Sequence, residues 1–230
     1  MKEVLESSIY FGVLLSLASY GLGVLLRKKT GWGFMNPLLV SIILVTVFLV
    51  CTGISYDSYK RGADLISYLL TPATICLAVP LYEQFEILKK NFTAVLVGTV
   101  SGVLSSLACI LLLSIVFGFD HTTFVTFLPK SITTAIGVGV CEEYGGIVSL
   151  GVVAIVITGV LGNVFSEAFL KLLKIDEPIA KGLAIGSSAH AVGTAKAFEI
   201  GPVEGAMSSL SIVVCGLLTV LLAPLFAFLL

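Results

Sequence analysis

Two short stretches decide the fold of this chain: SITTAIGVGVCEEYGG, residues 131–146, and SSAHAVGTAKAFEIGP, residues 187–202. Aligned at an offset of 56 residues, they pair Ala135 with Ala191, Gly137 with Gly193, Glu143 with Glu199 and Gly145 with Gly201. A long apolar run follows each stretch. The match predicts an internal duplication, each copy of which contains one short segment and one long helix.

Six long runs contain no Asp, Glu, Lys or Arg: residues 7–26, 31–56, 65–82, 91–119, 144–166 and 205–230. A helix of such a length crosses a hydrocarbon core of ~30 Å, because it rises ~1.5 Å per residue. Lipid cannot satisfy backbone amides, so the spans must be helical. With 57% hydrophobic and 12% charged residues, the chain is predicted to be an all-α polytopic membrane protein with about six transmembrane helices.

Two further uncharged runs, 131–141 and 182–195, are too short to cross. They are rich in Gly, Ser and Thr, which is typical of a broken helix lined by protein or water. We expect both to be re-entrant. The duplication is then inverted, because the second copy starts on the opposite face of the membrane. This predicts an N-terminal region of four spans at residues 1–120 and a transport region with two re-entrant segments and two spans at residues 121–230.

Basic residues favour this topology. With both termini outside, the inner side contains 9 of the basic residues and the outer side contains 4. The inner set is Arg27, Lys28, Lys29, Lys89, Lys90, Lys171, Lys174, Lys181 and Lys196, and the outer set is Lys2, Lys60, Arg61 and Lys130. The bias disappears if both short segments cross fully, so the positive-inside rule favours the re-entrant interpretation.

The short segments are the expected site. A helix broken at membrane depth offers unpaired N–H groups and a positive dipole end to an anion. Hydroxyls and cations nearby would add to this, and His190 could also exchange a proton. The candidate binding residues are Lys130, Ser131, Thr133, Thr134, Ser187, Ser188, His190, Thr194 and Lys196.

Plainer interpretations of these residues stay open. His190 could simply pack within a broken helix, and Lys196 could extend along the helix to the inner surface. Lys130 follows Pro129 and could be a solvated loop residue. Glu143 and Glu199 could pair with lysines or cap the next helix.

The chain resembles the LrgB/CidB family, the larger membrane partners of the holin-like LrgA/CidA proteins. The matching stretches are NPLLVSIILV (36–45), TPATICLAVPLYEQ (71–84), LPKSITTAIG (128–137) and GSSAHAVGTAKAFEIGPVEGAMSSLS (186–211). The family usually has Pro where this chain has Ala135 and Val148, so the first re-entrant segment is expected to bend differently.

The resemblance implies two functions. One is transport of small monocarboxylates of the pyruvate, glycolate and glycerate class across the bacterial plasma (inner) membrane, with an LrgA/CidA-like small membrane protein as partner. The alternative is an antiholin-like or holin-like regulator of murein hydrolase export, autolysis and cell death that carries no solute. Homo-oligomerisation stays open.

Other classes of function are not expected. The formal net charge of −1 gives no electrostatic attraction to nucleic acid. Gly137–Gly139 has no strand-turn-helix context, so it is no dinucleotide motif. No acidic cluster or Cys/His spacing indicates a metal. We therefore expect no enzyme, cofactor or metal site.

Overall fold

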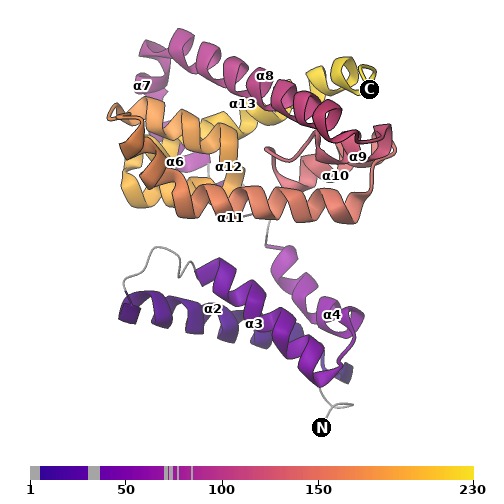
Figure 1. Ribbon diagram of the computed structural model, residues 1–230. Helices are drawn as coiled ribbons and strands as arrows, with labels where there is room; N and C mark the ends of the chain where they lie inside the picture. Colours follow the sequence, from indigo (N-terminus) through magenta and orange to yellow (C-terminus); the bar gives the residue numbers. More distant parts are fainter. Residues whose placement is uncertain (1–5, 31–36, 70–71, 73–74, 77, 84) are drawn as a thin grey trace. The chain divides into compact units, whose positions relative to one another are not determined.

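The computed structural model describes all residues except 1–5, 31–36, 70–71, 73–74, 77 and 84, and its described residues contain helices and no strand. The chain forms two compact units, residues 1–76 and 77–230. Each unit is described by itself below. Figure 1 labels the helices.

The first unit consists of α2 (Phe11–Thr30), α3 (Pro37–Thr52) and α4 (Tyr56–Ser67). Glycines allow α2 and α4 to touch backbone to backbone: a Cβ atom on Gly62 would lie 2.6 Å from the backbone nitrogen of Gly12. The Ser16 hydroxyl lies 2.8 Å from the Tyr59 hydroxyl across the same contact. Small residues that let helix backbones approach closely are typical of helix packing in membranes.

The second unit contains the long helices α8 (Phe92–Phe117), α11 (Val148–Leu172) and α13 (Pro202–Ala227). The shorter helices are α6 (Ala78–Glu83), α7 (Phe85–Lys90), α9 (His121–Phe127), α10 (Thr134–Glu143) and α12 (Pro178–Ile200). Helix α12 packs against α8, α11 and α13 (Figure 1).

Helix α12 turns back on itself at His190, whose φ of 42° and ψ of −139° are not helical. The first arm, residues 178–189, and the second arm, residues 191–200, lie side by side. A Cβ atom on Gly193 would be 3.0 Å from Ile185 Cγ2, whereas a straight helix separates residues eight apart by about 12 Å. Ile185 and Ala197 also share one buried cluster with Leu170 of α11.

Helices α9 and α10 form a second hairpin around residues 128–133. The Thr126 hydroxyl of α9 accepts a hydrogen bond of 2.7 Å from the backbone N–H of Ile147, just beyond α10. Two residues before α10 ends, Cys141 is buried beside Gly146. The chain therefore returns at Ile147 to the point at which it leaves α9, and the turn overlaps the start of the first of the two quoted stretches.

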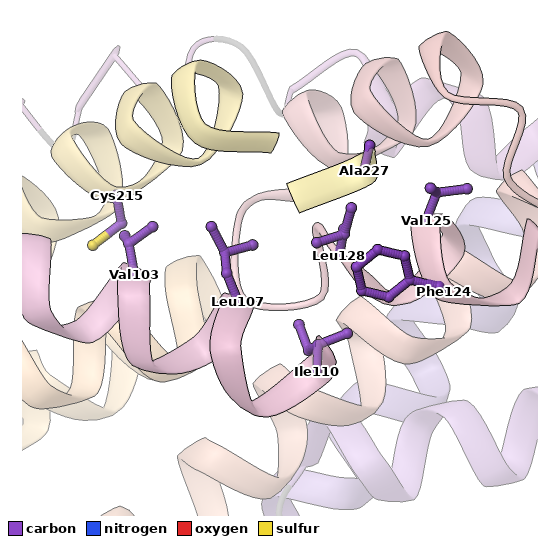
Figure 2. Packing of buried hydrophobic residues seen from close by; sticks show 8 residues of the cluster. All are labelled: Val103, Leu107, Ile110, Phe124, Val125, Leu128, Cys215 and Ala227. Carbon is purple, nitrogen blue, oxygen red and sulfur yellow. The ribbon is translucent and has the colours of Figure 1, made fainter. Parts of the chain in front are cut away.

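A buried apolar cluster holds the α9–α10 hairpin against the long helices (Figure 2). Phe124 of α9 has no exposed surface, and Leu107 of α8 is 1% exposed. Full burial of such side chains stabilises a fold by roughly 1.5–3 kcal/mol each. The members of the cluster are Val103, Leu107, Ile110, Phe124, Val125, Leu128, Cys215 and Ala227.

Within the described residues, four helices are long and apolar enough to cross a membrane: α2, α8, α11 and α13. Helix α3 is apolar but has 16 residues. The expected span over 65–82 lies partly outside the described residues, and the described part of that run belongs to several short helical pieces. The count of six spans is therefore not confirmed. Large side chains on the outside, such as Val116 at 75% and Leu221 at 61% exposure, indicate that this is a membrane protein.

Candidate functional site

A cavity of about 800 Å³ lies between α8, α11, α12 and the turn of the α9–α10 hairpin. Its polar lining comes from Ser105 and Ser106 of α8, Lys130 and Ser131 of the hairpin turn, Thr158 and Ser166 of α11, and Ser187 and Ser188 of α12. Among the described residues that line it, Lys130 alone carries a formal charge. Four separate chain segments therefore bring hydroxyl groups around one cation.

Lys130 is half-buried, and its ammonium group donates a hydrogen bond of 3.0 Å to the Ser131 hydroxyl. Ser131 Oγ also lies 3.1 Å from Ser106 Oγ. In the part of the chain that the structure describes, no carboxylate pairs with Lys130. An ammonium group has three donors, so two remain for a ligand. A solvated loop lysine would instead extend away from the protein.

Ser187 connects the cavity to two neighbouring spaces. It also lines a cavity of about 510 Å³ between α8 and the start of α12. A third space of about 10 Å³ is shared by Ser187, Ser131 and Thr219 of α13. Helix α8 passes α12 at this point, because a Cβ atom on Gly102 would meet Ser187 Oγ at 3.2 Å. The hydroxyl of Ser188 is partly used, since it donates to the carbonyl oxygen of Ala184 at 2.7 Å.

His190 and Thr194 hold the α12 turn in place and are not among the residues that line the cavity. His190 is 3% exposed, and its Nε2 lies 3.0 Å from the carbonyl oxygen of Ile155. Thr194 donates to the carbonyl oxygen of His190 at 2.9 Å and lies 2.7 Å from the Ser208 hydroxyl of α13. Proton coupling through His190 stays a prediction.

Lys196 lies on the second arm of α12 and is not among the residues that line the cavity either. Its ammonium group is 2.5 Å from Glu167 of α11 and 3.0 Å from Glu199. The side chain is 14% exposed. This ion-pair network ties the second arm to α11, so the plainer interpretation of Glu199 as a lysine partner agrees with the structure.

Thr133 and Thr134 mark the start of α10. Thr133 is the N-cap residue, although its side chain makes no capping hydrogen bond, and Thr134 is the first helical residue. Both are half-buried and outside the cavity lining. They place the N-terminus of α10 next to the turn that contains Lys130.

Both hairpin turns reach the same point of α11. A Cβ atom on Gly137 of α10 would be 2.5 Å from Ile155 Cδ1, and His190 contacts the carbonyl oxygen of the same residue. The structure therefore brings together Lys130, Ser131, Ser187 and Ser188 in the cavity. It places His190 and Thr194 behind the α12 turn, and Lys196 at the end of the second arm.

Sequence reasoning missed several residues of the site. Ser105 and Ser106 could have been identified from the sequence, since polar side chains within an apolar run are costly in lipid and usually face protein. The offset of 56 residues also pairs Ser131 with Ser187, which the cavity now brings together. Asn163 gave a similar signal: its Nδ2 donates a hydrogen bond of 2.7 Å to the carbonyl oxygen of Val192, just after the α12 break.

Comparison with known proteins gives one consistent result. The model of the LrgB-like family matches residues 16–229. The antiholin-like protein LrgB of Bacillus subtilis (strain 168) is 39% identical over 220 residues, which are 95% of each chain. No solved structure matches significantly. The family match includes the cavity and both hairpins.

Proposed function

The chain belongs to the LrgB-like family, and on that premise we propose an antiholin-like role in a bacterial plasma membrane. In this role the chain regulates a holin-like pore built by a small LrgA/CidA-like membrane protein. The name of the Bacillus subtilis relative, antiholin-like protein LrgB, supports this proposal over the transport function expected from the sequence. The exposed apolar faces of α8 and α13 give such a partner helices to pack against.

Dye release from liposomes tests the antiholin-like role. Vesicles containing the small holin-like protein and a trapped dye are compared with vesicles that also contain this chain. We expect the added chain to reduce the rate of dye release severalfold. An unrelated four-span membrane protein at the same density is the control for crowding. Release that is unchanged by this chain would reject regulation of the pore.

A second candidate function is transport of small monocarboxylates, which the cavity favours. A carboxylate is matched by the Lys130 ammonium group and by hydroxyls from two hairpins. Hairpins that begin and end on one side, and whose turns meet at α11, are consistent with an inverted repeat around a midplane site. We propose that arrangement here, with Ser131 and Ser187 as equivalent ligands.

Uptake by proteoliposomes tests transport. Purified protein, alone and with the small partner, is supplied with labelled pyruvate or glycolate. We expect Lys130→Gln to reduce uptake at least tenfold, because it removes the cation of the cavity. Lys171→Gln removes an exposed lysine outside the cavity and should leave uptake unchanged. No uptake by the unmodified chain, or equal uptake by Lys130→Gln, would reject transport through this cavity.

A further inference from the structure

The cavity is much larger than a three-carbon acid needs. Pyruvate, for example, has six non-hydrogen atoms and fills the space of a few water molecules, on the order of 100 Å³ at ~30 Å³ per water. The cavity measures about 800 Å³. That volume lies within the usual range for ligands of drug size.

One face of α11 forms the long wall of the cavity. Its lining residues recur with helical spacing from Thr158 through Leu161, Phe165 and Phe169 to Leu170, and Leu173 follows directly after the helix ends. Thr158 and Leu173 are fifteen residues apart, which is about 22 Å along a helix at ~1.5 Å per residue. Beyond Thr158 most of these residues are apolar. The cavity is therefore an elongated groove with an apolar wall.

Charge is concentrated at one end of the groove. The turn that contains Lys130 lies near Ile155, because Gly137 faces both Pro129 and Ile155. Thr158 is one turn of α11 further on, whereas Phe169 and Leu173 lie at the far end. Lys130, Ser131 and Ser106 therefore gather at the Thr158 end. At the other end, Leu173 and Ile175 make an apolar lining.

We infer that the cavity binds an amphipathic monocarboxylate of the fatty-acid class. Its carboxylate lies at the Lys130 ammonium group and the Ser131 hydroxyl, and its chain lies along Leu161, Phe165 and Phe169. A single cation matches a single carboxylate, and the apolar wall matches an unbranched chain. This inference rests on the proposal that the cavity binds carboxylates, but not on transport.

Cys109 provides a reporter, since it lines the cavity one helical turn from Ser106. Cys51 and Cys76 are also exposed and are replaced by Ser, whereas Cys141 and Cys215 are buried. The full chain is placed in phosphatidylcholine nanodiscs, and the rate of Cys109 alkylation by a small maleimide is measured. We expect dodecanoate to slow alkylation at least fivefold. Dodecanol, dodecylammonium and acetate should change the rate less than twofold.

Two variants distinguish recognition of the carboxylate group from recognition of the hydrocarbon chain. Lys130→Gln should remove the difference between dodecanoate and dodecanol. Phe165→Ala should weaken protection by dodecanoate but keep the preference for it over dodecanol. Rates are compared with and without ligand within each variant, so that each variant serves as its own reference. Equal protection by dodecanol, or protection by dodecanoate that survives Lys130→Gln, would overturn the inference.

Two further arms separate this inference from its alternatives. Protection by phosphatidylglycerol nanodiscs without dodecanoate would assign the groove to a membrane phospholipid and overturn the fatty-acid assignment. If Lys130-dependent pyruvate uptake is found without protection by dodecanoate, this inference fails and transport stands. If dodecanoate protects Cys109 but pyruvate uptake is absent, the inference stands and small-acid transport fails.

Discussion

His190 is the residue at which the backbone geometry departs furthest from ordinary helix. A φ of 42° with a ψ of −139° is a conformation that side chains disfavour and glycine adopts easily. The surrounding contacts hold this conformation. The imidazole lies against Gly159 and the carbonyl oxygen of Ile155, and the Thr194 hydroxyl donates a hydrogen bond to the carbonyl oxygen of His190. A strained residue held so firmly is typical of a site whose shape matters.

Two substitutions separate the backbone of His190 from its side chain. His190→Gly and His190→Ala both remove the imidazole, but only glycine relieves the strain of the backbone conformation. We expect His190→Gly to be the more stable of the two by about 1–3 kcal/mol. Thermal unfolding of both variants in the same detergent measures this. An alanine variant as stable as the glycine variant would contradict the geometry of the turn.

Asp120 caps α9 from the exposed segment that follows α8. Its carboxylate accepts a hydrogen bond of 3.0 Å from the backbone N–H of Thr123. The side-chain hydroxyl of Thr123 and, to a smaller extent, this backbone N–H lower the pKa of Asp120. A lowered pKa in the folded state stabilises the fold at neutral pH. The contribution is lost as the pH falls through the ordinary value of about 3.9 and the lower folded value.

Asp120→Asn tests this capping interaction. Asparagine keeps an oxygen that can cap the helix but cannot ionise. The stability of this variant should therefore fall less than that of the unmodified chain below about pH 4. Asp120→Ala should lower stability at every pH. Unfolding temperatures between pH 3 and pH 7 distinguish the two. Identical pH profiles for Asp120→Asn and the unmodified chain would rule out the effect.

At the scale of elements, glycine decides how closely α12 approaches α13. A Cβ atom on Gly186 would clash with the carbonyl oxygen of Ser208, and it would lie 2.8 Å from Ser211 Cβ. On Gly182 it would meet Met207 Cβ at 2.7 Å. The two glycines lie one turn apart, so one face of the first arm packs backbone to backbone against α13.

Alanine substitutions measure this contact. Gly186→Ala should destabilise the protein by about 1–3 kcal/mol, because the interface has no space for a methyl group. Gly139→Ala is the matched control, since nothing lies within 4 Å of its added Cβ atom. It should be neutral or stabilising by up to about 1 kcal/mol, as alanine favours helix. Unfolding in one detergent compares them, and equal losses at both positions would contradict the packing.

The helices could be predicted from the sequence more accurately than the positions at which they break. It indicated a broken helix within residues 182–195, and the structure places the break at His190, where the two arms separate. Periodicity could not locate that residue, because Gly193 and Gly186 satisfy turn preferences better and instead serve packing. Lys130 was predicted as a ligand beside a plainer alternative, and only tertiary contacts place it in a cavity.

The polar side chains of the long helices could not be assigned from sequence. Ser105, Ser106 and Thr158 lie within apolar runs in which a hydroxyl can equally bond to its own helix. Which helix face meets the hairpins depends on packing between segments far apart in the chain. The inverted relation of the two copies stays a prediction for the same reason, since length and composition identify spans but not their direction.

At the scale of the whole molecule, the hairpin form of α12 has a consequence for topology. Both ends of the hairpin lie near the same end of α11, because Leu170, Ile175 and Ile200 share one cluster. Residues just before and just after α12 should therefore face one side of the membrane. The α9–α10 hairpin should face the other side.

Impermeant maleimide labelling checks this topology in a background without Cys51, Cys76 and Cys109. We expect Lys174→Cys and Pro202→Cys to be labelled only from inside the cell. Glu143→Cys should be labelled from outside. Labelling of Lys174→Cys and Pro202→Cys from opposite sides would mean that α12 crosses the membrane completely.

The hairpin in α12 also bears on how the protein is made. Neither arm is long enough to leave the insertion machinery as a span of its own. Its many glycines and hydroxyls gain little from lipid, and the packing surface for its first arm belongs largely to α13, which follows it in the chain. The first arm of α12 therefore completes its packing only after α13 has been synthesised. A ribosome that stops before residue 202 would leave behind a chain in which the glycine face of the first arm has no α13 to pack against.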